Sequence, residues 1–242
     1  MTEIRNYDTA EDVAQAAAEN AIEILQLAIE TNGSASWVLA GGTSPMAAYG
    51  IIVKEYADAL DWSKVTVIIG DERMVPLDSK DSNWGTITKL FEKSPEVSQV
   101  QRIIPDTSID VETAARWYEE RIKEANIVSF DLAWIGVGED GHTLSLFPGN
   151  PAFTTPTEDW VISVHDSPKP PAERFTLSLK ALEYVAELVI FAVGAAKEKA
   201  LKEARLKRAL PVAVATDVVE ANGGEVRWLY DDAAWGEIES RR

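Results

Sequence analysis

The sequence predicts an α/β protein with a doubly wound, mostly parallel sheet flanked by helices. Three observations support this fold class. Short apolar runs of strand length alternate with longer segments in which apolar residues recur at helical spacing. The short runs are almost continuously apolar, which is typical of strands that are covered on both faces. The alternation repeats along most of the chain, and repeated strand–helix units build parallel sheets.

The expected strands are rich in Val, Ile and aromatic side chains and are bounded by turn residues. They are SWVLA (36–40), VTVIIG (65–70), RIIP (102–105), FDLAWIG (130–136), WVISV (160–164), ELVIFAV (187–193) and EVRWLY (225–230). The expected helices, with apolar residues on one face and charge on the other, cover 8–30, 45–56, 82–93, 110–125 and 195–210. The proline-rich stretch 150–171 is expected to be a long covering loop around one strand. No linker or repeat interrupts the pattern, so we expect residues 1–242 to form a single domain.

Composition and charge narrow the functional classes. The chain has no cysteine, which excludes disulfides, a thiolate nucleophile and a thiolate metal site. Its 23 Lys and Arg against 40 Asp and Glu give a net charge of -17, which disfavours nucleic acid and anionic membrane as partners. The polar, acidic start and the short apolar runs predict a cytoplasmic protein with no membrane span. A small anionic substrate would need cations and N–H groups gathered locally.

Ligands of a doubly wound sheet bind beyond the carboxyl ends of its strands, so the loops at these ends matter most. The first such loop, GGTSP, follows the strand at 36–40. Gly41 and Gly42 allow the backbone to approach a ligand, and Thr43 and Ser44 offer hydroxyl groups. A helix begins at the same point, and a helix N-terminus binds anions. The alternative is an ordinary strand-to-helix turn with a serine cap.

The stretch IGVGEDGHTLSLFPG (135–149) contains a GxGxxG spacing but does not predict a dinucleotide site. Glu139 and Asp140 stand inside the glycine triplet, where a pyrophosphate would meet negative charge, and Pro148 ends any helix almost at once. The loop instead presents Asp140 and His142 at a strand end. A neighbouring carboxylate orients a histidine for proton transfer near neutral pH. The alternative is a structural, hydrogen-bonded histidine, which is our interpretation of His165 in its apolar strand.

Charged residues after other strands complete the candidate site. Asp71, Glu72 and Arg73 follow the strand at 65–70, although a solvated charge cluster is the usual meaning of such a triplet. Arg174 and Lys197 are both expected near the carboxyl rim of the sheet. A bidentate arginine and a point-charge lysine suit a phosphate group, whereas either residue alone is more often a surface cation.

The motifs GGTSP, DERMVPLDSKDSN, GVGEDGHTLSLFPG, ERFTLSL and GAAKEKAL, in this order, resemble those of the 6-phosphogluconolactonases, which are relatives of the glucosamine-6-phosphate deaminases. The resemblance runs from about Asn6 to Trp235. It implies a modified Rossmann-like sheet and hydrolysis of a sugar-phosphate lactone, 6-phospho-D-glucono-1,5-lactone, in the oxidative pentose phosphate pathway. It implies no cofactor and no obligatory metal. Whether the protein is a monomer or a small homo-oligomer is left open.

The resemblance also implies roles for individual residues. His142 matches the family's catalytic base, with Asp140 and Asp71 beside it. The phosphate loop is matched by Gly41, Gly42, Thr43 and Ser44, assisted by Arg73, Arg174 and Lys197. We expect His142 to take a proton from the attacking water and to return it to the departing ring oxygen, with N–H groups of the glycine loop available for the oxyanion. Thr43-Ser44 stands where Ser-Thr is usual, and Leu144 where Ala is frequent.

Two rival functions are weighed against this one. The sister deaminases share most of these motifs but carry a glutamate five residues after the histidine, where this chain has Phe147. They also tend to have Asp-Glu-Tyr at positions 71–73. Both differences favour the lactonase. A non-catalytic sugar-phosphate sensor on the same fold is disfavoured by the intact Asp140 and His142 pair and by the lack of a basic extra domain.

Overall fold

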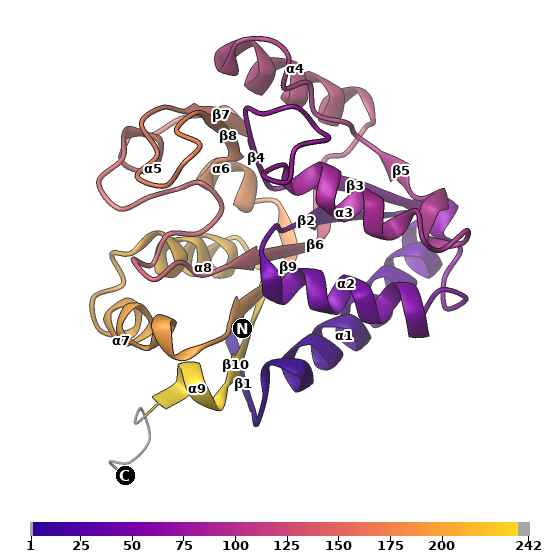
Figure 1. The fold of residues 1–242 in the computed structure, drawn as a ribbon, viewed down its shortest axis with the longest axis horizontal. Coiled ribbons are helices and arrows are strands. Elements are labelled where there is room, and N and C mark those ends of the chain that lie inside the picture. The colour runs from indigo at the N-terminus through magenta and orange to yellow at the C-terminus, as the bar shows by residue number, and fades with distance from the viewer. Residues whose placement is uncertain (1, 237–242) are drawn as a thin grey trace.

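The computed structural model describes residues 2–236, so the ends of the predicted domain 1–242 lie outside the described residues (Figure 1). Within this range the main sheet has seven strands in the order β1-β10-β9-β6-β2-β3-β5. These are β1 (Thr2–Tyr7), β10 (Glu225–Asp231), β9 (Val185–Ala192), β6 (Phe130–Gly136), β2 (Ala35–Leu39), β3 (Val65–Ile69) and β5 (Gln101–Arg102). Every neighbouring pair is parallel, which confirms the predicted doubly wound sheet.

The strand order locates the expected ligand crevice. The chain proceeds from β2 outward to β3 and β5, and from β6 outward in the other direction to β9 and β10. The order therefore reverses between the adjacent strands β2 and β6. In open α/β sheets, ligands bind beyond the carboxyl ends of the strands at such a reversal. The loops that leave these two strands are the GGTSP loop and the glycine loop that carries His142.

A second, antiparallel sheet of the described chain has the order β4-β8-β7. Its strands are β4 (Asp71–Arg73), β8 (Arg174–Leu177) and β7 (Val161–Val164). The predicted strand at 160–164 thus exists, but it belongs to this small sheet and not to the parallel one. Asp71 lies opposite Thr176, and Arg73 lies opposite Arg174, so the pairing brings two loops of the candidate site together.

The helices confirm most of the predicted segments. They are α1 (Ala10–Asn32), α2 (Thr43–Glu55), α3 (Asn83–Phe91), α4 (Val111–Glu124), α5 (Pro151–Thr154), α6 (Leu179–Leu182), α7 (Glu198–Lys207), α8 (Pro211–Ala221) and α9 (Asp232–Trp235). The predicted helix at 195–210 is divided: a 3-10 turn at Ala195–Lys197 precedes α7, and Pro211 starts α8 as a separate helix. Proline is favoured in the first turn of a helix because it lacks an N–H group. None of the helices in residues 2–236 is long and apolar enough to cross a bilayer.

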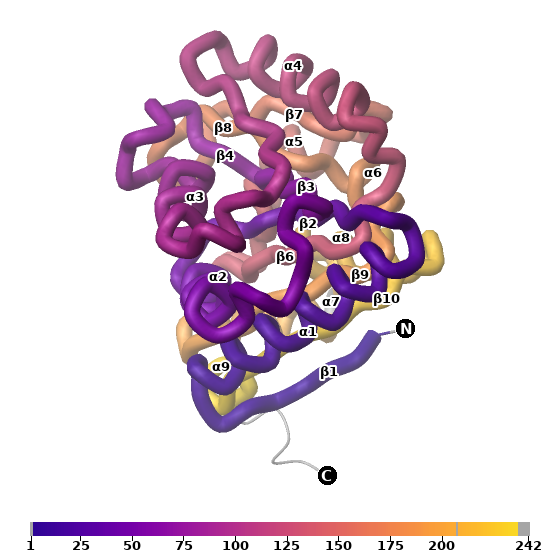
Figure 2. The backbone as a smooth tube through the Cα atoms, turned by 90° about the vertical axis from the view of Figure 1, so that its right-hand side faces the viewer, coloured from indigo at the N-terminus to yellow at the C-terminus, as the bar shows by residue number. Residues whose placement is uncertain are grey.

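The helices pack on both sides of the main sheet, with α1 and α2 on one side and α7 and α8 on the other (Figure 1). The small sheet and α4 lie together at the end of the molecule opposite β1, as the view turned by 90° shows (Figure 2). β1 is a polar edge strand that pairs only with β10 in the main sheet. Its exposure explains why the apolar pattern of the sequence did not predict it.

An aromatic cluster connects the core to the GGTSP loop. The Trp37 and Trp134 rings meet edge to face with centroids 4.9 Å apart, and Tyr49 stacks on Trp134 at the same distance. The Tyr49 hydroxyl accepts a hydrogen bond from the Ala40 N–H (3.0 Å) and donates one to the Ala40 carbonyl (3.2 Å). Because Ala40 immediately precedes the glycine pair, the core fixes the point where that loop begins.

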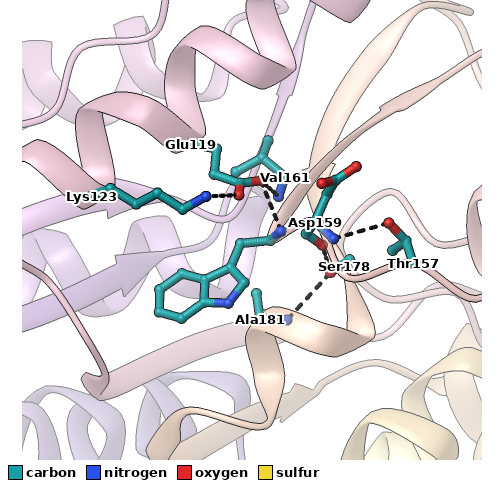
Figure 3. Close-up of polar contacts among 8 residues, drawn as sticks. Glu119, Lys123, Thr157, Asp159, Val161, Ser178 and Ala181 are labelled. Carbon is teal, nitrogen blue, oxygen red and sulfur yellow. Dashed lines mark hydrogen bonds and ion pairs between the residues drawn. The ribbon is translucent and has the colours of Figure 1, made fainter.

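A buried carboxylate attaches α4 to the small sheet (Figure 3). Glu119 accepts hydrogen bonds from the backbone N–H groups of Trp160 (2.8 Å) and Val161 (3.0 Å), and it forms an ion pair with Lys123. Ser178 caps α6 and donates to the carbonyl of Asp159 (2.6 Å). These bonds anchor the covering segment 150–171 at its middle, so its remaining part is held above the carboxyl rim of the main sheet.

Candidate active site

A cavity of about 390 Å³ opens where the carboxyl ends of β2, β6 and β9 meet the small sheet. The residues predicted from the sequence that line it are Gly41, Gly42, Thr43, Ser44, Asp71, Arg73, His142, Arg174 and Lys197. Asp140 does not line the cavity but contacts His142 from behind. The structure therefore brings all of the predicted site residues together around one cavity and its histidine.

The GGTSP loop has the form of an anion-binding site. Gly42 is the N-cap of α2 with φ 101°, and no side chain caps this end of the helix. A Cβ atom on Gly41 would lie 2.1 Å from the Asn83 Oδ1 atom, so this position also requires glycine. Thr43 and Ser44 are the first two residues of α2, and their N–H groups are not needed for helical bonds. Ser44 is not a cap, so the alternative of a serine-capped turn is wrong, and the loop leaves donors for a ligand.

Asp140 and His142 form a hydrogen-bonded pair at the end of β6. The His142 Nδ1 atom lies 2.5 Å from the Asp140 Oδ1 atom, which leaves Nε2 as the ring nitrogen for a substrate. The turn that holds them needs glycine twice: Gly141 has φ 78°, and a Cβ on Gly138 would lie 1.9 Å from the His142 Nδ1 atom. The glycines of GxGxxG thus serve the close approach of a histidine and not of a pyrophosphate.

The electrostatics of this pair suit a base that is neutral before reaction. Burial lowers the pKa of His142, and the hydrogen bond and charge of Asp140 oppose this effect only in part. For Asp140, burial raises the pKa, but the hydrogen bonds and charge of His142, together with the charge of Lys169, outweigh it, so the net pKa is lowered. Near neutral pH the imidazole is therefore unprotonated and the carboxylate ionised, the arrangement that general base catalysis requires.

Phe147 completes the surroundings of the histidine. Its buried ring packs against the His142 ring with centroids 4.5 Å apart, and the Arg174 guanidinium lies 5.6 Å from its centroid. The position that distinguishes the two sister activities is thus in direct contact with the catalytic candidate. An apolar ring here contributes burial and offers no group that can transfer a proton.

Asp71 does not touch the histidine pair. Its Oδ2 atom accepts a hydrogen bond from the Ser145 hydroxyl (2.5 Å), and the Arg174 Nη1 atom lies 3.5 Å from that same hydroxyl oxygen. Asp140 is therefore the residue that orients His142, a point the sequence left open. Ser145 was not singled out from the sequence, although it stands in the same glycine-loop motif.

The Asp71, Glu72 and Arg73 triplet is not a solvated charge cluster, because both acids are buried. Glu72 accepts hydrogen bonds from the N–H groups of Asn83 (2.9 Å) and Trp84 (2.6 Å), where α3 begins. Burial raises its pKa against the effect of these bonds. Glu72 is thus structural, while Arg73 lines the cavity and donates to the Asp81 carbonyl (2.7 Å).

Arg174 is buried and engaged with the covering segment. It donates to the carbonyl oxygens of Lys169 (2.8 Å), Pro170 (3.3 Å) and Pro171 (3.1 Å). Burial lowers its pKa. It is therefore not a surface cation, and its contacts place Lys169 at the rim of the cavity.

Three findings lie outside the sequence predictions. Lys169 and Asn83 both line the cavity but were not identified. The proline on either side of Lys169 was the available signal, since prolines stiffen a loop. The interpretation of His165 is wrong in part: it lies just beyond β7, is exposed, and its Nε2 atom is 3.0 Å from Glu112 Oε1.

Metal-ligating side chains are not clustered in this site. Residues 2–236 contain no group of three or more His, Cys, Asp or Glu side chains that could hold a metal ion.

A histidine–aspartate pair and an uncapped helix N-terminus at one cavity are the groups expected of an acid/base enzyme that acts on a small anionic substrate. The chain belongs to the glucosamine-6-phosphate isomerases/6-phosphogluconolactonase family, whose model matches residues 8–228. Among its relatives is the 6-phosphogluconolactonase of Rattus norvegicus, which is 35% identical over 74% of this chain and 70% of the relative. Another is the "Probable 6-phosphogluconolactonase 1" of Arabidopsis thaliana, 29% identical over 98% of this chain and 94% of the relative.

Solved structures agree with this family. A 6-phosphogluconolactonase from Thermotoga maritima is 27% identical, with a TM-score of 0.82 over 96% of this chain and 100% of that one. The 6-phosphogluconolactonase from Trypanosoma cruzi superposes with a TM-score of 0.83 over 100% of this chain and 98% of that one, at 23% identity. At this low identity, the comparison with the Trypanosoma cruzi structure shows only that the fold is shared.

Proposed function

We propose that this protein hydrolyses 6-phospho-D-glucono-1,5-lactone to 6-phospho-D-gluconate, a step of the oxidative pentose phosphate pathway. The proposal rests on a single cavity whose two ends carry different chemical groups. His142, half-buried and hydrogen-bonded to the exposed Asp140, lies at one end, and the uncapped N-terminus of α2 lies at the other; Lys197 also lines this cavity. A lactone joined to a phosphate needs both: a base for the water that attacks the ester and donors for the anion.

In the proposed mechanism, His142 Nε2 removes a proton from a water molecule as its oxygen attacks the lactone carbonyl. The carbonyl π electrons move to its oxygen, giving a tetrahedral oxyanion, and Asp140 stabilises the imidazolium through Nδ1. The carbonyl re-forms, the bond to the ring oxygen breaks, and His142 returns its proton to that oxygen. Deprotonation of the new carboxylic acid releases one proton to solution. No covalent intermediate is needed.

The phosphate is proposed to bind at the start of α2. Gly42, Thr43 and Ser44 supply backbone N–H and hydroxyl donors, and Lys197 and Arg73 supply charge. Burial lowers the pKa of Lys197, opposed by the neighbouring carboxylates Glu139 and Asp140. Arg174 contributes positive charge to the cavity and holds the covering segment in place through its bond to the Lys169 carbonyl.

The deaminase activity of the sister enzymes is the competing function. It needs a carboxylate for ring-opening proton transfers, whereas Phe147 fills that position with a buried ring. The test follows proton release in weak buffer on adding the purified protein to fresh 6-phosphogluconolactone, with ammonia release from glucosamine 6-phosphate as the parallel assay. Acid production above the spontaneous rate supports the lactonase. Ammonia release without acid production supports the deaminase. No product in either assay supports a non-catalytic sugar-phosphate sensor.

The setting of the enzyme is part of the proposal. We place it in the cytoplasm as a single domain, acting as a monomer or a small homo-oligomer without nucleic acid or membrane. The net charge of -17 and the lack of cysteine support this setting. Some plant relatives are named chloroplastic. Cell fractionation and light scattering test the compartment and the oligomeric state.

A further inference from the structure

Three N–H groups of the glycine loop are engaged within the turn and are not available as oxyanion donors. The Gly138 N–H donates to the His142 carbonyl (2.8 Å), and the Gly141 N–H donates to the Gly138 carbonyl (2.9 Å). The His142 N–H is directed to the Asp140 carboxylate (3.3 Å). These three donors are committed to shaping the turn. A cation that lines the cavity is a further candidate partner for the negative charge that develops on the lactone carbonyl.

Lys169 is one of four basic residues that line the cavity, with Arg73, Arg174 and Lys197. Its charge acts on both His142 and Asp140, lowering the pKa of each. Arg73 donates to the Asp81 carbonyl, and Arg174 to carbonyls of the covering segment. Among residues 2–236 the Lys169 ammonium forms no hydrogen bond or ion pair, so it is free to contact a ligand.

The backbone around Lys169 is fixed although the side chain is exposed. Its carbonyl accepts hydrogen bonds from Arg174 Nη2 (2.8 Å) and from the Ser167 hydroxyl (2.9 Å). Its N–H lies 3.2 Å from the same Ser167 oxygen, and Pro168 and Pro170 restrict the chain on both sides. A buried arginine and a rigid turn thus hold the backbone of Lys169 at the cavity, and its side chain is exposed there.

We infer that Lys169 stabilises the oxyanion of the tetrahedral intermediate and afterwards contacts the carboxylate of the product. This inference rests on the proposed lactonase function. The ammonium donates a hydrogen bond to the carbonyl oxygen as negative charge develops there, and it transfers no proton. When the carbonyl re-forms, the negative charge passes to the departing ring oxygen, which His142 protonates; the new carboxylic acid then loses a proton, and the Lys169 ammonium contacts the carboxylate so formed. The phosphate remains with the α2 N-terminus and Lys197.

The test compares Lys169→Gln with wild type on phosphorylated and unphosphorylated gluconolactone. An oxyanion role predicts that kcat falls by about tenfold to a hundredfold on both lactones, less than for a buried oxyanion donor because this ammonium is exposed to water. KM for the phosphorylated lactone and inhibition by inorganic phosphate stay near the wild-type values. Lys169→Arg restores part of kcat. Lys54→Gln, which removes the same charge from the exposed face of α2, is the matched control.

A second measurement separates a chemical role from a structural one. The charged groups that act on His142 are Asp140, Asp71 and Lys169, and only Lys169 lowers its pKa. Removing that cation favours the imidazolium, so the acid limb of kcat/KM moves to higher pH in Lys169→Gln. An altered fold alone does not produce this shift together with an unchanged phosphate inhibition.

The outcomes distinguish the two proposals. A raised KM for the phosphorylated lactone, with normal turnover of gluconolactone, would assign Lys169 to the phosphate and overturn the inference. Wild-type kinetics on both lactones in Lys169→Gln would also overturn it and leave the lactonase function intact. Absence of lactone hydrolysis by the wild-type protein would instead overturn the proposed function itself.

Discussion

The two ends of the cavity differ in how their polar groups are used. At the histidine end, Nδ1 of His142 and the N–H groups of Gly138 and Gly141 are all engaged within the turn. At the α2 end, Gly42 caps the helix without any side-chain bond, and donors are left free. A proton-transfer group must be held in one orientation, whereas an anion site must keep its donors for the ligand. In this cavity, the polar groups around the proposed proton-transfer residue are hydrogen-bonded within the protein, whereas the proposed anion-binding end keeps donors free for a ligand.

The largest effect is expected at the histidine end. His142→Ala removes the only proton-transfer group of the pair that faces the cavity, so we expect kcat to fall by about 10²- to 10⁴-fold. KM for the phosphorylated lactone stays close to wild type because the α2 end is untouched. His165→Ala, at the exposed histidine, is the matched control and keeps full activity. Near-normal turnover in folded His142→Ala would remove the histidine from the mechanism.

A change at the proposed phosphate contacts is expected to act on binding. Lys197→Gln removes a positive charge from the phosphate but no hydrogen bond that holds the fold. A charge-assisted contact of about 1.5–3 kcal/mol predicts a rise in KM of roughly tenfold to a hundredfold. Inhibition by inorganic phosphate weakens in parallel, and circular dichroism checks that the fold is retained. If kcat fell while KM and phosphate inhibition stayed the same, Lys197 would belong to the histidine end.

The smallest expected effect is a shift of the pH profile. Burial lowers the pKa of His142, and the Phe147 ring supplies part of that burial. Phe147→Leu keeps the site apolar but covers less of the imidazole, so the pKa of His142 rises towards its usual value. Activity needs the neutral imidazole, and the acid limb of kcat/KM therefore moves to higher pH. A shift to lower pH would contradict the role given to the phenyl ring.

The sequence predicted the features that depend on strong local patterns. The buried parallel strands are continuous apolar runs, and the long helix at 8–30 is confirmed by α1, which begins at a Thr9–Asp12 capping box. The Asp140–His142 pair follows from two neighbouring residues and their glycines. Such features need no knowledge of distant contacts.

The small sheet could not be predicted in the same way. β4 has the sequence DER, which is charged, and it pairs with β8 about a hundred residues away. Burial of Asp71 and Glu72 depends on Ser145 and on the start of α3, which the linear pattern does not place beside them. Lys169 was missed for the same reason, because the buried Arg174 is what holds it at the cavity.

The most direct test of the division between the two ends is the ratio of kcat/KM for 6-phosphogluconolactone to that for unphosphorylated gluconolactone, measured in His142→Ala and Lys197→Gln. The account predicts that His142→Ala lowers both constants by the same factor and leaves the ratio at the wild-type value. It predicts that Lys197→Gln lowers only the constant for the phosphorylated lactone, so the ratio falls. A changed ratio in His142→Ala, or a ratio at the wild-type value in Lys197→Gln, would contradict the assignment of catalysis to His142 and of phosphate binding to Lys197.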